Sequence, residues 1–142
     1  MIKTRKLKSI AVPEMSEDKE FKQELQQILI DCGISPSLMG FNYIRDGVMI
    51  LKANYDVGTP LPEVSIISVY EAISLYYKDR SIQKVERCIR NAVTQAFLKG
   101  NIKLLEEIFS YTISSVSGKV KNREFLIGLC LYLIEKERKA NG

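Results

Sequence analysis

The chain of 142 residues contains no histidine and no tryptophan. Without histidine it has no Ser-His-Asp or Cys-His pair, no imidazole base at neutral pH and no histidine ligand for a metal. Its cysteines are few and scattered, at Cys32, Cys88 and Cys130. They have no CxxC spacing, which makes a metal site weak. An odd number of thiols among aliphatic residues predicts free, packed cysteines in a reducing compartment.

The sequence also lacks a long hydrophobic run and the motifs of common enzymes. Its longest apolar stretch, residues 125–134, is about half as long as a membrane span. The basic N-terminus lacks the apolar region of a signal peptide. The glycines are dispersed rather than gathered in a phosphate-binding loop, and no base is placed to activate a serine or threonine. We therefore expect a cytoplasmic protein that is not an enzyme and binds no cofactor, metal or membrane.

Helical periodicity dominates what the sequence does contain, and the length corresponds to one domain. Apolar residues recur at helical spacing and predict helices at about 16–32, 37–53, 62–77, 81–99 and 122–139, with a short helix from 101 onward. Residues that cap or end helices flank these segments: Ser16, Ser37 and Ser81 before them, Pro62 in a first turn, and Gly33 and Gly100 after them. We predict an all-α, six-helix domain with almost no strand and with a small hairpin within 111–120.

The N-terminal arm is basic. Its first 12 residues carry four cations and no acid, a charge equal to the net charge of +4 of the whole chain: Lys3, Arg5, Lys6 and Lys8. We divide the chain into this arm, 1–15, and a helical domain, 16–142. The arm is either a short strand or a flexible tail. It either contacts DNA, in the minor groove or along phosphates, or only improves solubility.

The predicted helix 81–99 follows its predecessor after a short turn at 78–80, which makes the pair a candidate helix-turn-helix. One side of this helix is apolar: Val85, Cys88, Ile89, Ala92, Val93 and Ala96. The other side carries residue types that hydrogen-bond base edges or phosphates: Gln83, Lys84, Glu86, Arg87, Arg90, Asn91 and Thr94. From Lys78 to Lys103 there are seven basic residues before the acidic pair 106–107, but only two acidic ones, which favours phosphate binding. An ordinary solvated helix face is the alternative.

Several segments resemble one known family. VERCIRNAV (85–93), followed by KGN (99–101), resembles the recognition helix of the C-terminal DNA-binding effector domains of the stage 0 sporulation master response regulators. GFNYIRDGV (40–48), IFSYTISS (108–115) and NREF (122–125) resemble other segments of that family in the same order. The likeness covers about residues 18–138. It implies a six-helix domain with a helix-turn-helix at its third and fourth helices. It also implies transcription regulation at TGTCGAA-like sites in duplex DNA, often in tandem and bound by two protomers.

The resemblance also implies roles for individual residues. Family residues that match Glu86 and Arg87 touch bases, and the one that matches Arg90 contacts the DNA. With the polar side of the helix, this gives a predicted DNA-binding set: Ser81, Gln83, Lys84, Glu86, Arg87, Arg90, Asn91 and Thr94. Candidate phosphate contacts are Lys99, Lys119, Lys121 and Arg123. The family surface that approaches the sigma subunit of RNA polymerase gives candidate polymerase contacts at Asn101, Leu104, Leu105, Phe109 and Ile113.

The chain departs from the family pattern at some positions. The family usually has Ser-Arg in place of Gln83-Lys84 and His in place of Asn91, which predicts a different base preference at the edge of the site. No receiver domain precedes the helices in this sequence, so the chain is either an excised fragment or a stand-alone effector. We expect the stand-alone form, nucleoid-associated and without phosphorylation control. The alternative is an interaction module that binds the sigma subunit or the full-length regulator as an antagonist.

The last predicted helix is apolar on nearly every side over residues 125–134. Such a helix is either buried in the core or shared with a partner. Two interpretations follow: core packing, or a homodimer contact through Leu129, Tyr132 and Leu133.

Overall fold

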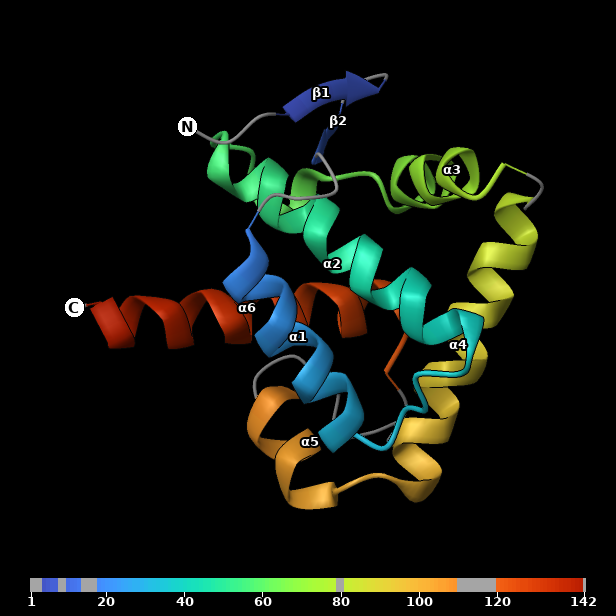
Figure 1. Ribbon diagram of the computed structural model, residues 1–142, viewed down its shortest axis with the longest axis vertical. Coiled ribbons are helices and arrows are strands. Elements are labelled where there is room, and N and C mark those ends of the chain that lie inside the picture. Colours follow the sequence, from blue (N-terminus) through green and yellow to red (C-terminus); the bar gives the residue numbers. More distant parts are fainter. Residues whose placement is uncertain (1–3, 8–9, 14–17, 79–80, 110–119, 142) are drawn as a thin grey trace.

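The computed structural model describes residues 4–7, 10–13, 18–78, 81–109 and 120–141. Within these residues it contains six α-helices (Figure 1), so the all-α prediction is confirmed: α1 Lys19–Asp31, α2 Met39–Asp56, α3 Ile66–Tyr76, α4 Ile82–Lys99, α5 Ile102–Phe109 and α6 Asn122–Asn141. Helix α2 is central, because it packs against α1, α3, α4 and α6 and is buried along most of its length. No helix in the described part of the chain is long and apolar enough to cross a membrane.

Local capping chemistry sets several helix boundaries as predicted. Ser81 caps α4, where its hydroxyl oxygen accepts a hydrogen bond of 3.1 Å from the Lys84 N–H. Gly100 follows the last residue of α4. Gly33 follows α1 with φ of +90°, a left-handed conformation that glycine adopts without a steric cost. These three residues end or begin helices through interactions within a few residues of the chain.

Two predicted helix starts are wrong. Pro62 lies in a single 3-10 turn, η1 (Leu61–Glu63), and the backbone is then extended at Val64 and Ser65. Helix α3 therefore begins at Ile66, with the Ser65 hydroxyl accepting from the Ser68 N–H at 3.2 Å. Ser37 does not cap α2, whose N-cap is Leu38. The Ser37 N–H instead donates to the Ser35 hydroxyl oxygen within the preceding turn. The predicted cap Ser16 and the hairpin predicted within 111–120 lie outside the described residues.

The basic arm forms two short strands, one of the two alternatives that its sequence left open. Strands β1 (Thr4–Leu7) and β2 (Ile10–Pro13) pair in antiparallel register, with Leu7 opposite Ile10. In β2, Ile10, Ala11 and Val12 are buried, and the strand packs on α2 and α3. The Ala11 N–H donates to the side chain of the buried Asn54, whose amide donates back to the Ala11 carbonyl, both at 3.0 Å. This pair of bonds fixes β2 to α2.

Buried charge holds the start of α1 against α2. Lys52 on α2 is 7% exposed, and its ammonium pairs with Asp56 at 2.9 Å and with Asp18, which precedes α1, at 3.1 Å. Its pKa is raised, because hydrogen bonds to both carboxylates outweigh the opposing effect of burial. Lys52 therefore links α2 to the start of α1, at a residue 34 positions away along the chain.

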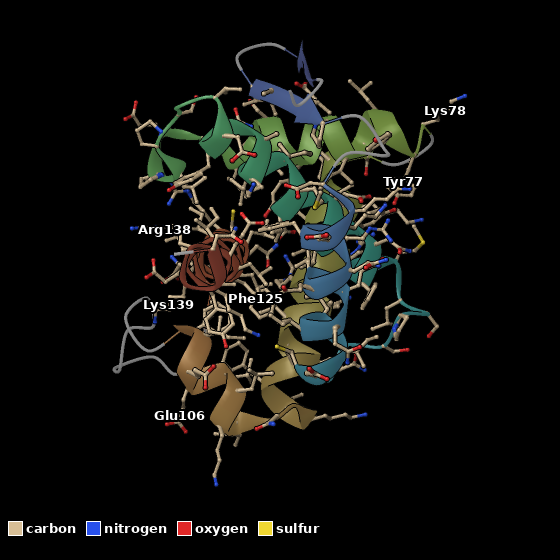
Figure 2. All side chains as sticks on the ribbon, turned by 60° about the vertical axis from the view of Figure 1, so that its left-hand side comes forward. Tyr77, Lys78, Glu106, Phe125, Arg138 and Lys139 are labelled. Carbon is tan, nitrogen blue, oxygen red and sulfur yellow. The ribbon has the colours of Figure 1, made fainter. Side chains whose placement is uncertain are left out.

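The apolar last helix is a core helix. Leu129 and Leu133 of α6 are almost completely buried, so the interpretation of these two residues as a homodimer contact is wrong for the folded chain. Tyr132 is half-buried, and its hydroxyl donates to Glu107 of α5. Phe125 lies in the interior between α6 and α5 (Figure 2), with its ring stacked on Phe109 at a centroid distance of 5.0 Å. Core packing therefore explains the apolar character of α6.

The crossing of α2 and α4 requires a glycine. A Cβ atom at Gly40 would lie 2.4 Å from the Cys88 carbonyl oxygen and 2.7 Å from the Cβ of Ala92. Both neighbours belong to α4, and neither is the far end of a flexible side chain. Gly40 thus lets the backbones of α2 and α4 approach closely, and this approach sets where α4 lies.

We expect Gly40→Ala to lower the free energy of unfolding by about 1–3 kcal/mol, the usual cost of overpacking a core. The matched control is Gly47→Ala in the same helix. There the nearest atoms are methyl ends of Leu126 at 3.3 and 3.4 Å, which can shift. Both variants gain the same helix propensity. Urea unfolding measures the difference, and equal stabilities of the two variants would contradict the steric role of Gly40.

Two of the three cysteines are core residues, as predicted, and Cys88 is half-buried. Cys32 and Cys130 are fully buried, and burial raises the pKa of each thiol from 9.0 to about 12. A thiol with a raised pKa contributes stability that is complete below pH 9 and is lost as the pH rises toward 12. The cause is that the unfolded chain ionises its thiols first.

The free energy of unfolding should therefore fall above pH 9 by about 1.4 kcal/mol per pH unit for each buried thiol. Cys130→Ala should have a lower free energy of unfolding at pH 8. Above pH 9 its free energy of unfolding should fall less steeply than that of the wild type, because one buried thiol no longer contributes. Chemical unfolding at pH 8, 9, 10 and 11 measures both slopes. Parallel slopes for the wild type and the variant would refute the assignment.

Candidate nucleic-acid interface

Helices α3 and α4 are consecutive and pack against each other; in Figure 1, α3 runs across the view and α4 descends from its end. The predicted apolar side of α4 faces the core, because Val85, Ile89, Ala92, Val93 and Ala96 are all buried. The predicted polar side faces solvent, with Gln83, Arg87, Arg90, Asn91 and Thr94 exposed and Lys84 and Glu86 partly exposed. The described residues thus place the whole polar set on one accessible face.

Charge on this face is organised around one ion pair. Arg90 Nη1 lies 2.6 Å from both carboxylate oxygens of Glu86, one helical turn earlier. Within the described part of the chain, no acidic side chain pairs with Lys84 or Arg87. The Thr94 hydroxyl donates to the Arg90 carbonyl, and Ser81 is engaged as the N-cap. Lys84 and Arg87 are therefore the cations of this face that are free to meet a phosphate or a base.

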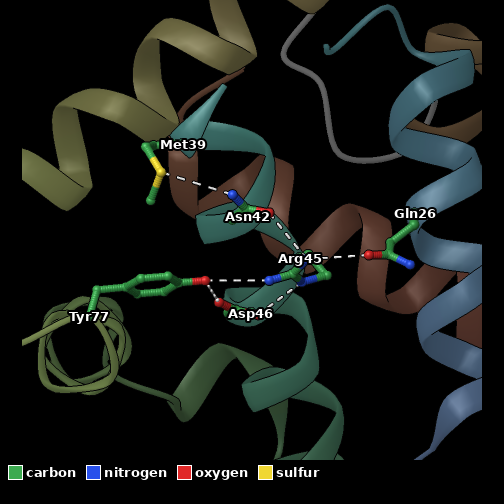
Figure 3. Close-up of polar contacts among 6 residues, drawn as sticks. All are labelled: Gln26, Met39, Asn42, Arg45, Asp46 and Tyr77. Atoms are coloured by element: carbon green, nitrogen blue, oxygen red, sulfur yellow. Dashed lines mark hydrogen bonds and ion pairs between the residues drawn. The ribbon is translucent and has the colours of Figure 1, made fainter. Parts of the chain in front are cut away.

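A polar network holds the end of α3, directly before the turn into α4 (Figure 3). The Tyr77 hydroxyl donates to Asp46 at 2.6 Å and accepts from Arg45 at 3.3 Å. Arg45 also donates to Asn42 at 3.1 Å and to Gln26 of α1 at 3.3 Å. Burial and the Asp46 carboxylate raise the pKa of Tyr77 well above its usual value of 10. The network therefore ties the last residue before the turn to α2 and, through Arg45, to α1.

The turn itself has a left-handed residue, Lys78, with φ of +59°. This conformation is uncommon for a residue other than glycine and persists where neighbouring structure imposes it. The Lys78 side chain is exposed and projects away from the body of the domain (Figure 2). The described start of the turn is thus anchored at Tyr77 and presents a cation to solvent.

Tyr77→Phe should lower the free energy of unfolding by about 1–3 kcal/mol, because Asp46 loses a charge-assisted hydrogen bond. Tyr55→Phe is the matched control, since Tyr55 is 40% exposed and its hydroxyl makes no hydrogen bond within the described residues. Thermal and urea unfolding of both variants measure the effect. A Tyr77→Phe variant as stable as Tyr55→Phe would show that the network contributes nothing.

The start of α6 lies beside α4 and brings further candidate residues there. The Asn122 side-chain amide donates to the Tyr70 hydroxyl of α3 at 3.1 Å and to the Glu86 carbonyl of α4 at 3.0 Å. Its neighbours Lys121 and Arg123 are exposed, and Arg123 donates to the Pro62 carbonyl. Two predicted phosphate contacts therefore flank a residue that touches both helices of the pair.

The remaining predicted phosphate contacts lie elsewhere. Lys99 is exposed at the opposite end of α4. Lys119 lies outside the described residues. The structure therefore brings Lys121 and Arg123, but not Lys99, close to the first turns of α4.

The candidate polymerase contacts divide into surface and core residues. Asn101 is exposed, and its side chain accepts from the Leu104 N–H at 3.2 Å at the start of α5. Leu104 is half-buried, whereas Leu105 and Phe109 are 3% and 0% exposed. Ile113 lies outside the described residues. A partner of this region would therefore meet Asn101 and its exposed neighbours Leu98 and Ile102, while Leu105 and Phe109 support α5 from within.

Sequence reasoning did not find Asn122, Tyr70 or the Tyr77 network. The helical pattern places Asn122 only at the start of the predicted helix 122–139, and it predicts no role for Tyr70 or Tyr77. Their hydrogen-bond partners lie 31 to 52 residues away along the chain. The one sequence signal is a polar residue, Asn122, at the first position of a helix that is apolar over residues 125–134.

The chain matches a family of known proteins. The family described as "Sporulation initiation factor Spo0A C terminal" matches residues 25–133. The match covers most of the chain and all of α2 to α5.

Proposed function

The chain belongs to the family of Spo0A C-terminal domains, which are DNA-binding regulatory domains rather than enzymes, and from that premise we propose that it reads duplex DNA in a sequence-specific manner. Helices α3 and α4 form the helix-turn-helix, and α4 is the recognition helix that enters the major groove. The observation that carries this proposal is the solvent-facing polar side of α4. It lies opposite the apolar side that packs into the core.

The first turns of α4 supply the base contacts. In a recognition helix these turns come closest to the base edges. Arg87 is exposed and unpaired within the described residues, so its guanidinium is free to bind a guanine through O6 and N7. Glu86 suits the amino group of a cytosine, and Asn91 suits an adenine. Gln83, Lys84 and Thr94 lie on the same face and complete the contact surface.

The ion pair between Glu86 and Arg90 prepares this surface. Arg90 holds both oxygens of the Glu86 carboxylate, which restricts the side chain before any DNA arrives. A carboxylate has further lone pairs and can accept from a cytosine while it keeps the arginine. The pair thus lowers the entropy that Glu86 loses on binding and keeps an acidic group from repelling the phosphates.

Phosphate contacts position the domain on the duplex. Lys121 and Arg123 at the start of α6 lie beside the recognition helix, where backbone N–H groups of the helix also favour an anion. Lys99 and Lys119 complete the proposed set. The site is TGTCGAA-like and is bound in tandem by two protomers, as the family resemblance implies.

Arg87→Ala should weaken binding to the cognate duplex by about 1–3 kcal/mol and relax the preference for one base pair. Arg138→Ala is the matched control, because it removes the same charge at the far end of α6, away from the turn at Lys78 (Figure 2). Fluorescence anisotropy with the cognate and single-substituted duplexes measures both effects. Equal losses of DNA affinity in the two variants would show that Arg87 contributes only its charge to binding.

The wild-type chain provides the decisive experiment. Selection from random duplexes, followed by titration over a salt series, should recover a TGTCGAA-like sequence that binds more tightly than a scrambled one at physiological salt. A steep dependence on salt without preference for any sequence would leave only non-specific electrostatic binding and overturn the proposal.

A second candidate function rests on the corner between α4 and α5. Leu98 and Ile102 are 77% and 64% exposed there, beside the exposed Asn101. Exposed apolar side chains of this size suit a protein partner. The corresponding function is an interaction module that binds the sigma subunit or the full-length regulator. Retention of either protein in a pull-down, together with no sequence preference in the selection, would favour it over DNA recognition.

A further inference from the structure

The side chain of Asn122 hydrogen-bonds residues of both α3 and α4. It is the first residue of α6, and only 9% of it is exposed. A side-chain amide has two N–H donors, and two acceptors lie within reach of the Asn122 nitrogen: the Tyr70 hydroxyl of α3 at 3.1 Å and the Glu86 carbonyl of α4 at 3.0 Å. One buried side chain therefore bridges both helices of the proposed helix-turn-helix.

The bond to Glu86 fixes the main chain of α4 where the base contacts begin. Glu86 lies in the second turn of the helix, and its carboxylate holds Arg90. A helix carbonyl accepts one bond from the N–H four residues later and has a second lone pair, which Asn122 fills. The bond to this carbonyl therefore fixes the position of the backbone that carries the side chains of Glu86 and Arg87.

The other end of the bridge is equally well defined. Tyr70 is 4% exposed, and burial raises the pKa of its hydroxyl further above the ordinary tyrosine value. The start of α6 has one more tie to the rest of the domain, because Arg123 donates to the Pro62 carbonyl. Within the segment, the Lys121 N–H donates to Glu124 at 3.3 Å. The segment 121–124 is thus attached to η1, α3 and α4.

This arrangement links two kinds of DNA contact. Lys121 and Arg123 are proposed to hold phosphates, and Glu86 and Arg87 are proposed to read bases. Asn122 lies between the two cations in the sequence and bonds the backbone of the base-reading turn. Phosphate contacts set the register of a protein on the duplex, whereas base contacts specify the sequence. If α6 and α4 are rigidly linked, phosphate contacts that hold α6 at one place on the duplex also hold α4 at one depth in the groove.

We propose that Asn122 is a positioning residue for DNA recognition, which holds the base-reading turn of α4 at a fixed place relative to the phosphate contacts of α6. This inference rests on the proposed function. Loss of the bridge lowers discrimination between sequences and leaves the number of phosphate contacts unchanged. It therefore affects the specific complex far more than the non-specific one.

The test uses the whole chain with Asn122→Ala, and the milder Tyr70→Phe in case the first variant folds poorly. The ratio of affinities for the selected and the scrambled duplex should fall about tenfold in Asn122→Ala, the scale of one lost base-pair contact. In Tyr70→Phe the fall should be smaller, because the bond to Glu86 persists. The slope of affinity against salt should stay at its wild-type value in both variants.

Asn54→Ala is the matched control for stability alone. Asn54 is also a buried asparagine, and its amide donates to the Ala11 and Ile50 carbonyls, at the hairpin rather than at α4. This variant should lose stability and keep the wild-type affinity ratio. If folded Asn122→Ala kept that ratio too, the role would be structural only and the inference would be wrong. A wild-type chain without sequence preference would instead show the failure of the proposed function itself.

Hydrogen exchange without DNA gives an independent readout. The Arg90 N–H bonds the same Glu86 carbonyl through the helix, so its exchange should become several-fold faster in Asn122→Ala than in Asn54→Ala. Equal rates in the two variants would show that Asn122 does not hold this turn, whatever the affinity for DNA.

Discussion

The close approach of α2 and α4 at Gly40 is the constraint on which the arrangement of the domain depends. At that point α2 lies against the Cys88 carbonyl and the Ala92 methyl group, with no room for a side chain. Near the other end of α4, Gly100 lies equally close to the Cys32 carbonyl, where a Cβ would stand 2.1 Å away. Backbone contacts of this kind leave a helix little freedom to slide or roll. The exposed side of α4 is therefore presented in one orientation, which a surface that reads fixed base positions requires.

Polar ties supplement these contacts at the points where packing alone is weaker. The Tyr77 network fixes the chain before α4, and Asn122 fixes its second turn. Both ties use buried or half-buried groups whose partners are complete, so each gives direction as well as stability. The domain thus combines an apolar core centred on α2 with a few directed bonds, and those bonds gather around the helix with the proposed function.

The sequence predicted those parts of the fold that local chemistry decides. Ser81, Gly33 and Gly100 mark helix ends through bonds and dihedral angles within a few residues, and periodicity identified the solvent side of α4 correctly. Pro62 misled because proline suits the first turn of an α-helix and of a 3-10 turn alike. The extended residues that separate η1 from α3 have no comparable signal. Local pattern does not decide whether the N-terminal arm is a strand or a flexible tail, because β2 is stabilised by Asn54, 43 residues away.

The candidate site shows the same division. Exposed residues of α4 could be chosen from one helix at a time, whereas Asn122 and Tyr70 form a contact across 52 residues that no local pattern contains. Resemblance to a family also has a limit of its own. It transferred Leu105 and Phe109 as members of a functional region, but a matched position does not state exposure, and both side chains lie in the core. A partner of this region would contact the exposed residues around Asn101, which Leu105 and Phe109 support from the core.

The bonds between Asn54 and Ala11 have a consequence for self-association. An exposed strand with free N–H and carbonyl groups is a template on which a second molecule can add a strand of its own. At the middle of β2 both backbone groups of Ala11 are already taken by one side chain. The Asn54 side chain makes the two hydrogen bonds that a neighbouring strand would make with Ala11, so these groups are not available to another molecule. A two-stranded hairpin can therefore persist on a helical domain without inviting a third strand at β2.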